Sequence, residues 1–321
     1  MLTVGVQTWG TDVAALERYW RVADELGYAR ITYGDGLGGW THDGWTMLGA
    51  LAVLTRRARI GPAVTYAFDP SSHHPSWLAK RAVAVDHLSG GRLDLRLAVG
   101  AEDADAARTW SAHGIRYPPA AARIETLEES VRIVRGLWQT DHGLDHRGPR
   151  YELSGARLGA PPVQRPGPPI WIAAMGPRAL ALTARCADAW EASYVPPADF
   201  ATRWQRLSAL LRAEGRGAGP FRRSVELDAI VTEAGEPLDP PMARFCTDRD
   251  IDRAHPLLGT VLAGDGAAIS GRMAAYEAAG ATDLMLGFAD FPSTHMLGLF
   301  AATVLHGRLP WPGTLMRGRR R

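Results

Sequence analysis

The sequence predicts a single (β/α)8 barrel, and two observations carry this prediction. Short apolar segments alternate along the chain with longer segments of helical periodicity, which is typical of α/β folds. Eight such pairs fit within 321 residues, a length suited to an eight-stranded barrel with insertions. A doubly wound sheet is the competing arrangement, but no Gly-x-Gly-x-x-Gly motif follows the first apolar segment, as a dinucleotide-binding fold would show.

The expected strands are short and mostly apolar, and two of them end at glycine. The first reads LTVGVQTW and the fourth reads LDLRLAVG. Runs of this kind between turn residues are typical of parallel strands that are buried on both faces. The predicted strands are 2–9, 29–34, 59–67, 93–100, 168–175, 189–195, 224–232 and 282–288.

Helices are expected between these strands. Asp12 is placed to cap the first helix, whose apolar residues keep helical spacing until Gly27. The expected helices are 13–26, 45–54, 75–88, 124–138, 177–187, one that follows strand 189–195 and ends near 213, 265–279 and 293–306. Three stretches carry the least pattern, and we expect them to determine the substrate: 101–122, 140–167 and 233–262.

Composition excludes several classes of protein. The longest apolar runs are shorter than the roughly 18 residues that a membrane span requires, and the first ten residues lack the pattern of an export signal. Two cysteines, Cys186 and Cys246, are too few for a disulfide framework or a zinc cluster and fit a cytoplasmic location. We expect residues 1–310 to form one domain and 311–321 to be a disordered basic tail. Without the four arginines of its last five residues, the chain has 32 basic and 34 acidic residues, which does not indicate a nucleic-acid partner.

Active sites of such barrels lie at the carboxyl ends of the strands, and two sequence features fall there. Gly176-Pro177 follows a strand and begins a helix, so unpaired backbone N–H groups are available for a phosphate; an ordinary β–α turn is the alternative. The loop 35–45 reads DGLGGWTHDGW, and its flat aromatic side chains suit a planar ring system; packing on the barrel rim is the alternative. His73 and His74 precede a helix, where a structural role is favoured.

The motifs converge on a family. The segment 59–100, RIGPAVTYAFDPSSHHPSWLAKRAVAVDHLSGGRLDLRLAVG, resembles the signature of the luciferase-like monooxygenase superfamily. Further similarity lies in helix 123–138, in PPVQRPGPPIWIAAMGPRAL (161–180), in 187–190 and in 262–286. The resemblance implies a bacterial-luciferase-like barrel with insertions. It also implies an oxidoreductase that holds either FMN or the deazaflavin coenzyme F420 with its ring in the barrel mouth.

The resemblance also implies roles for single residues. Asp35 matches an acid near the cofactor ring, and Ala63-Val64 falls where the family often has a cis peptide bond. Trp40 matches the tryptophan of the sugar-phosphate dehydrogenase branch, and Glu102 or Asp103 falls near its catalytic glutamate. The predicted cofactor-binding residues are Asp35, Ala63, Val64, Tyr66, Gly100, Ala101, Ala173, Ala174, Met175 and Gly176; the candidate catalytic residues are Trp40, His42, Glu102 and Asp103.

One departure from the pattern bears on the reaction. Deazaflavin dehydrogenases of this family usually carry histidine directly after the strand-2 aspartate, and this chain has Gly36, which argues against sugar-phosphate oxidation. The leading hypothesis is hydride transfer between reduced F420 and a small organic substrate. An FMN-dependent monooxygenase supplied by a separate flavin reductase, pyridine-nucleotide or folate chemistry, and a catalytically decayed barrel that binds a ligand remain alternatives. The resemblance further suggests a homodimer.

Overall fold

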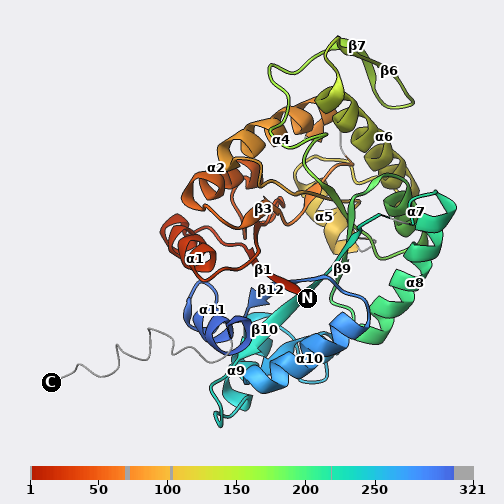
Figure 1. Cartoon of the computed structure of the whole chain (residues 1–321). Coiled ribbons are helices and arrows are strands. Elements are labelled where there is room, and N and C mark those ends of the chain that lie inside the picture. Colours follow the sequence, from red (N-terminus) through yellow and green to blue (C-terminus); the bar gives the residue numbers. More distant parts are fainter. Residues whose placement is uncertain (1, 69–72, 102–103, 218, 307–321) are drawn as a thin grey trace.

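Parallel strands form a ring at the centre of the molecule, and helices cover its outside (Figure 1). The computed structural model describes residues 2–68, 73–101, 104–217 and 219–306. Around the ring the strands follow the order β3-β2-β1-β12-β10-β9-β8-β5-β4, with β11 paired to β10. A parallel bridge between Ile60 and Leu93 joins β3 to the start of β5 and closes the ring. The barrel predicted from the sequence is therefore confirmed.

The strands lie where the apolar segments predicted them. The third predicted strand is divided into two short elements, β3 and β4, and every pairing in the ring is parallel. The ring strands are β1 (Thr3–Thr8), β2 (Arg30–Tyr33), β3 (Arg59–Pro62), β4 (Thr65–Tyr66), β5 (Leu95–Ala98), β8 (Ile170–Ala173), β9 (Ala189–Ser193), β10 (Arg222–Val231) and β12 (Asp283–Phe288), and β11 is Leu262–Gly264.

The helices pack their apolar residues on the outer face of the ring. The Asp12 side chain accepts a hydrogen bond from the Ala15 N–H, so the predicted cap of the first helix is confirmed. The helices are α1 (Val13–Glu25), α2 (Gly44–Leu54), α4 (Pro75–Ser89), α5 (Ala104–Ala112), α6 (Ala120–Gln139), α7 (Pro177–Cys186), α8 (Pro197–Ala213), α9 (Asp239–Asp248), α10 (Gly266–Ala278) and α11 (His295–Phe300), which continues as a π-helix over Ala301–Leu305.

The stretches with least pattern contain elements that the sequence analysis missed. Helix α5 lies within 101–122, α9 lies within 233–262, and an antiparallel hairpin of β6 (Leu144–Arg147) and β7 (Glu152–Ala156) lies within 140–167. The hairpin strands are polar and half-exposed, so they lack the apolar run that identifies a barrel strand. The predicted basic tail, 311–321, lies outside the described residues.

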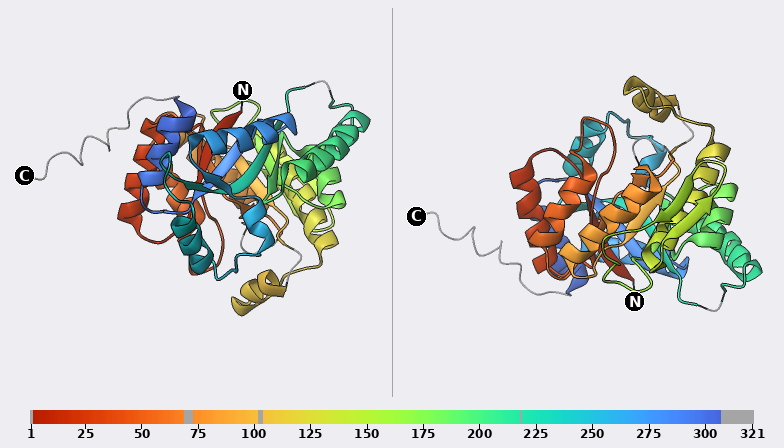
Figure 2. Two further views of the ribbon diagram at one scale, coloured as in Figure 1. Left: turned by 90° about the horizontal axis from the view of Figure 1, so that it is seen from below. Right: turned by 90° about the horizontal axis from the view of Figure 1, so that it is seen from above.

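The two ends of the barrel differ in what surrounds them. Figure 2 shows the chain beginning at one end, while α5 projects beyond the other end, at which β5 finishes. Within the described residues, no helix is both long and apolar enough to cross a membrane, and no group of acidic, histidine or cysteine side chains is arranged to hold a metal ion.

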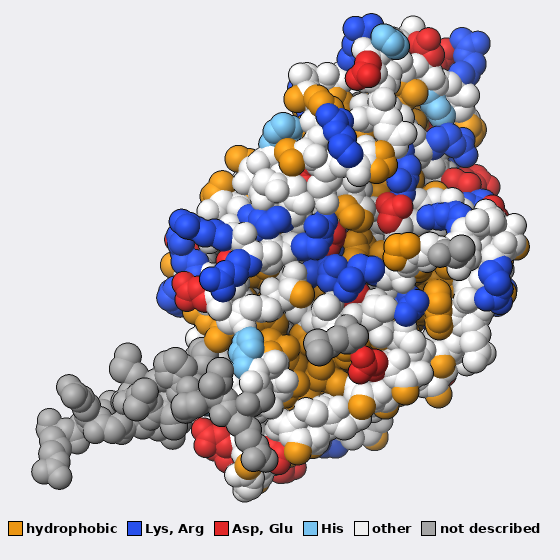
Figure 3. Space-filling view, in the orientation of Figure 1, with side chains coloured by type: hydrophobic (Ala, Val, Ile, Leu, Met, Phe, Trp, Pro, Cys, Tyr) orange, Lys and Arg blue, Asp and Glu red, His pale blue; other side chains and the backbone are white. Residues whose placement is uncertain are grey.

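Inside the end where the chain begins, buried charges form a paired network. Asp283 is 1% exposed and accepts hydrogen bonds from Arg222 at 2.6 and 2.9 Å and from the side chain of Arg30. Arg30 also donates to Asp94 at 2.9 Å. Burial alone would raise the pKa of Asp283, but the hydrogen bonds from Arg222 and the charge of Arg30 outweigh it and lower that pKa. Basic side chains gather near the centre of this end in Figure 3.

Candidate active site

At the end of β2, the Asp35 carboxyl is buried in a network of polar side chains. Asp35 is 8% exposed, and its Oδ2 accepts a hydrogen bond of 2.5 Å from the Thr65 hydroxyl. The Trp45 indole N–H donates to the same hydroxyl at 3.1 Å. A Cβ at Gly44 would lie 2.5 Å from the Asp35 carboxylate, so only glycine fits there. Burial raises the pKa of Asp35; Asp43 adds to the rise and His73 opposes it.

The Trp40 indole folds back over the glycines of its own loop. A Cβ at Gly34, Gly36 or Gly38 would approach the indole to 2.7, 2.9 and 2.0 Å respectively, while half of the Trp40 surface stays exposed. Gly36, the position at which related dehydrogenases usually have histidine, therefore forms part of the surface on which the indole rests. A side chain at position 36 would displace Trp40.

His42, proposed as a proton donor, is exposed and bound to the loop after β1. Its ring Nε2 lies 2.9 Å from the Thr11 carbonyl oxygen, and its backbone N–H donates to the Tyr33 hydroxyl at 2.8 Å. The Tyr33 hydroxyl in turn donates to the Gly10 carbonyl. These contacts attach the tryptophan loop to the barrel rim. The catalytic role of His42 stays a prediction.

Between β3 and β4 the Ala63–Val64 peptide bond is cis, as the resemblance led us to expect. Tyr66 follows it and packs edge-on against Trp110 of α5 and against Phe68, with ring centroids 5.7 and 6.2 Å apart. This aromatic contact attaches α5, which projects beyond the barrel, to the barrel mouth.

The loop after β5 is held by a buried arginine. Arg123, which is 3% exposed, donates to the carbonyl oxygens of Val99 and Ala101 at 2.6 and 2.9 Å. Gly100 has a φ of +81°, and a Cβ there would meet the Tyr117 hydroxyl at 2.4 Å. The backbone of 99–101 is thus fixed at the mouth. Glu102 and Asp103, the next two catalytic candidates, lie outside the described residues.

After β8 the chain turns into α7 as the sequence predicts. Gly176 is the N-cap, Pro177 is the first helical residue, and no side chain caps the first N–H groups. A Cβ on Gly176 would have no described atom within 4 Å. The Ala174 carbonyl accepts the Trp190 indole N–H at 2.7 Å, which fixes the segment that leads into the turn. Ala173 and Met175 flank Ala174 in the sequence, and Met175 is 37% exposed. Free N–H groups beside open space suit an anionic group of a cofactor.

The sequence analysis missed an acidic pair on β10. Glu226 and Asp228 are two residues apart, so they share one face of the strand. Gln7 Nε2 donates to Glu226 Oε1 at 2.7 Å across the barrel interior. Asp228 is 1% exposed, and its Oδ1 accepts a 2.5 Å hydrogen bond from Arg249 Nη2. Two acids at alternate positions among the apolar residues 225–231 are the sequence signal that identifies this pair.

The surroundings of the acidic pair shift its protonation. Burial raises the pKa of Asp228 to about 7, Glu226 adds to the rise, and the Arg249 guanidinium opposes it. Asp228 Oδ2 is buried and has no hydrogen-bond partner among the described residues. Tyr194, a non-glycine residue with a φ of 51°, follows β9. Its pKa is raised by burial and by the two carboxylates.

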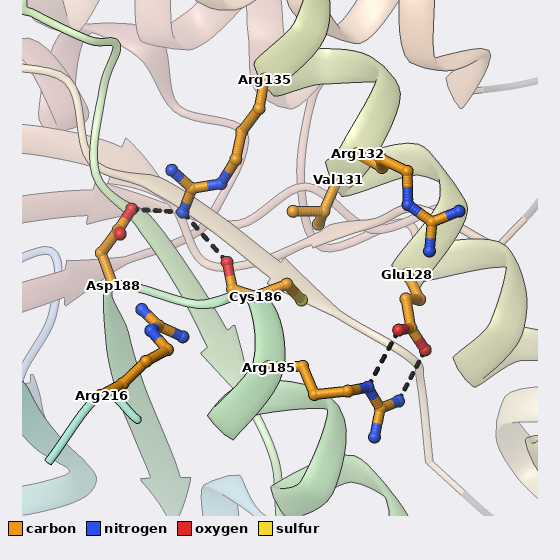
Figure 4. Close-up of a pocket in the computed structure, with 8 residues that line it drawn as sticks. All are labelled: Glu128, Val131, Arg132, Arg135, Arg185, Cys186, Asp188 and Arg216. Carbon is orange, nitrogen blue, oxygen red and sulfur yellow. Dashed lines mark hydrogen bonds and ion pairs between the residues drawn. The ribbon is translucent and has the colours of Figure 1, made fainter. Parts of the chain in front are cut away.

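A second cluster of charges lines a pocket on the outer surface between α6 and α7 (Figure 4). Arg135 donates to the Cys186 carbonyl and to Asp188 at 3.0 and 2.7 Å. Arg216 donates to the Ala184 and Ala187 carbonyls at the same helix end. Both guanidiniums therefore bind the carboxyl-terminal end of α7, where cations are favoured. Burial raises the pKa of the Cys186 thiol to about 12, so that thiol is protonated.

Comparison with known proteins identifies the family. The model of the luciferase-like monooxygenase family matches residues 3–285. The chain belongs to this family. A ketoreductase of phthiodiolone and phenolphthiodiolone dimycocerosates from Mycobacterium tuberculosis is 33% identical over 178 residues, which are 54% of this chain and 44% of the relative. The chain thus spans less than half of the length of this curated relative.

Solved structures of luciferase-like enzymes share the fold over nearly the whole chain. An F420-dependent secondary alcohol dehydrogenase, solved with an F420–acetone adduct, has a TM-score of 0.82 at 14% identity and covers 96% of this chain and 99% of its own. The oxygenating part of a type II Baeyer–Villiger monooxygenase from Pseudomonas putida, solved with FMN, has a TM-score of 0.73 at 16% identity, with coverage of 96% and 99%. The neighbours thus include both F420- and FMN-dependent luciferase-like oxidoreductases.

Proposed function

We propose that the protein is an oxidoreductase that transfers hydride between reduced coenzyme F420 and the carbonyl carbon of a small organic substrate. The buried Asp35–Thr65–Trp45 network carries this proposal, because it supplies an acid at the position where deazaflavin enzymes of the family place one near the ring. A ketoreductase and a secondary alcohol dehydrogenase among the similar proteins agree with a carbonyl–alcohol pair as substrate and product.

The residues at the mouth fit such a cofactor. The uncapped start of α7 faces open space and suits a phosphate of the cofactor tail. At the edge of the mouth, the small residues Ala98 and Gly100 leave room for a ring to approach the backbone. Bound there, F420 supplies a carbon that accepts or delivers hydride. The protein would hold the ring against the cis peptide at Ala63–Val64, and Trp40 would help to exclude water.

An FMN-dependent monooxygenase is the second candidate. The likeness to a Baeyer–Villiger monooxygenase that was solved in complex with FMN favours it. Such an enzyme would require a flavin reductase as a partner. A barrel that binds a ligand without catalysis is the third candidate, and a homodimer remains a proposal for the assembly.

Equilibrium titration of the cofactor-free protein with F420 and with FMN, followed by fluorescence, separates these functions. We expect tight binding of F420 and weak binding of FMN. Tight binding of FMN alone would replace the proposal by oxygen chemistry. Binding of both, followed by no reduction of any ketone, would favour the ligand-binding barrel.

The phosphate turn has a matched pair of variants. Gly176→Val places a branched side chain in open space beside the free N–H groups of α7, so the fold should persist while F420 affinity falls by about tenfold or more. Gly159→Val adds the same atoms where a Cβ also meets no described atom, away from the turn, and should leave affinity unchanged. Equal affinities for the two variants would reject the phosphate assignment.

A further inference from the structure

Asp228 projects into the barrel mouth beside a position that lacks a side chain. Its strand partner on β12 is Gly287. A Cβ at Gly287 would lie 3.1 Å from Asp228 Oδ1 and 3.0 Å from the Trp9 ring, so both side chains lie over the inner face of this glycine. Asp228 and Gly287 lie near the carboxyl ends of β10 and β12, and Trp9 directly follows β1. Because active sites of such barrels lie at the carboxyl ends of the strands, the Asp228 carboxyl belongs to the candidate active site.

The two acids of β10 differ in how well they are paired. Glu226 accepts from the Gln7 amide at 2.7 Å and is hydrogen-bonded to Tyr194. Asp228 accepts from Arg249 through Oδ1 alone, and its Oδ2 is buried without a hydrogen-bond partner in the described part of the chain. A buried carboxyl oxygen without a partner gains a hydrogen bond when it is protonated and its O–H donates to a bound ligand.

The groups around Asp228 supply both signs of charge. Arg249, directly after α9, is positive, and Glu226 on the same strand is negative. Tyr194, after β9, interacts electrostatically with both acids, while β12 and β1 present Gly287 and Trp9, which do not titrate. Together with burial, the neighbouring glutamate keeps the proton on Asp228 up to a pH of about 7, the pKa of that carboxyl.

We propose that Asp228 is the proton donor to the oxygen of a carbonyl substrate, through its free Oδ2. This inference rests on the proposed function. In the reaction, a hydride with its electron pair passes from the reduced deazaflavin to the carbonyl carbon, and the carbonyl π electrons take the Asp228 proton to form the alcohol. The cofactor is thereby oxidised and the ketone reduced. Asp228 becomes a carboxylate, and water later returns its proton.

Arg249 has a complementary role as a positioning residue. Its guanidinium, 2.5 Å from Oδ1, would stabilise the negative charge that remains on Asp228 after the transfer. The hydrogen bond from Arg249 to Oδ1 also fixes the orientation of the protonated carboxyl, and with it the position of Oδ2. Proton transfer from a fixed group of this kind contributes rate factors of roughly 100 to 10,000.

Infrared difference spectroscopy of the cofactor-free protein tests the proton directly. We expect a carbonyl stretch of a protonated carboxyl that is lost as the pH rises through about 7. Asp35 and Asp290 also have raised pKa values, so Asp228→Asn must remove the component assigned to Asp228, and Asp290→Asn must leave it. A spectrum that is the same in wild type and Asp228→Asn would overturn the proposal.

Turnover provides the second readout. With reduced F420 and a series of aliphatic ketones beginning with acetone, Asp228→Asn should lower kcat by roughly 100-fold or more and abolish the loss of kcat/KM above about pH 7. Its F420 affinity should match that of the wild type. Asp290, which accepts a hydrogen bond from the Met296 N–H in the first turn of α11, provides the control Asp290→Asn, expected to retain turnover.

The outcomes distinguish this inference from the proposed function. If the wild type does not bind F420, or binds it and reduces no ketone, the function and the inference both fall. If the wild type reduces a ketone and Asp228→Asn does so equally well with the same pH profile, the inference alone falls.

Discussion

Two buried aspartates at opposite ends of the barrel interior show how differently this fold uses charge. Asp283, at the end where the chain begins, receives hydrogen bonds on both oxygens from Arg222, and its pKa is lowered. Asp228, at the mouth, receives one from Arg249, and its pKa is raised to about 7. Both residues are 1% exposed. Pairing rather than depth therefore separates a carboxylate that stabilises the barrel from one that is available for chemistry.

The largest expected effect is at the paired end. Asp283→Asn removes the carboxylate that Arg222 and the buried Arg30 share and leaves Arg30 with Asp94 as its remaining charge partner, so the free energy of unfolding should fall by about 3 kcal/mol. Urea denaturation measures this loss. Glu17→Gln, which removes an exposed pair with Arg21, is the control and should change stability by less than about 1 kcal/mol. If the two variants lost similar amounts of stability, the buried pairing of Asp283 would not stabilise the barrel more than an exposed ion pair does, and the proposed structural role of Asp283 would be wrong.

The barrel itself was predictable because its strands are buried on both faces. Ile170–Ala173 is a continuous apolar run, Leu95–Ala98 is apolar apart from Arg96, and segments of helical periodicity separate such strands. The hairpin Leu144–Ala156 was missed because its residues alternate between half-buried and exposed with many charges, so no hydrophobic pattern identifies it. Helix α5 escaped for a related reason, since it projects beyond the barrel and is mostly exposed.

The candidate site was predictable in part. Strand ends located Asp35 and the Gly176 turn, because each follows an apolar run directly. The sequence did not predict that the Trp40 indole packs on the glycines of its own loop. It also did not predict the contact between Asp228 and Arg249. Both depend on contacts between residues that spacing does not relate, and Arg249 is 21 residues from its partner.

The next effect, of about 2 kcal/mol, is on the pH dependence of stability, and it follows from about 1.4 kcal/mol for each pKa unit. In the folded protein Asp228 keeps its proton up to about pH 7, whereas in the unfolded chain an aspartate releases it near pH 4. Between these values unfolding releases a proton, so this group makes stability fall as the pH rises. Asp228→Asn should therefore reduce the fall in unfolding free energy between pH 5 and pH 7 by that amount.

Asp283 should act with the opposite sign. Because its pKa is lowered in the folded protein, Asp283 stabilises the fold at pH values above the pKa of an aspartate in the unfolded chain. This contribution is lost as the pH falls through the folded pKa. Urea denaturation at several pH values measures both slopes. An unchanged slope between pH 5 and pH 7 in Asp228→Asn would mean that Arg249 keeps Asp228 ionised, and the contrast between the two ends would be lost.

The smallest effect is expected in the charged pocket between α6 and α7. A variant there tests whether paired charges outside the barrel also contribute to stability and not to cofactor binding. Arg185 donates to both Glu128 oxygens at 2.9 and 2.6 Å, and the Arg185 hydrogen bond lowers the pKa of Glu128. Because the pair is partly exposed, Glu128→Gln should reduce stability at pH 7 by less than about 1 kcal/mol, and less still in high salt. The reduction should vanish in acid, as the pH falls through the lowered pKa and Glu128 becomes protonated. F420 affinity should be unchanged in the same variant. A change in affinity would show that the pocket is coupled to the barrel mouth. In that case, full pairing of a charge would not identify it as purely structural.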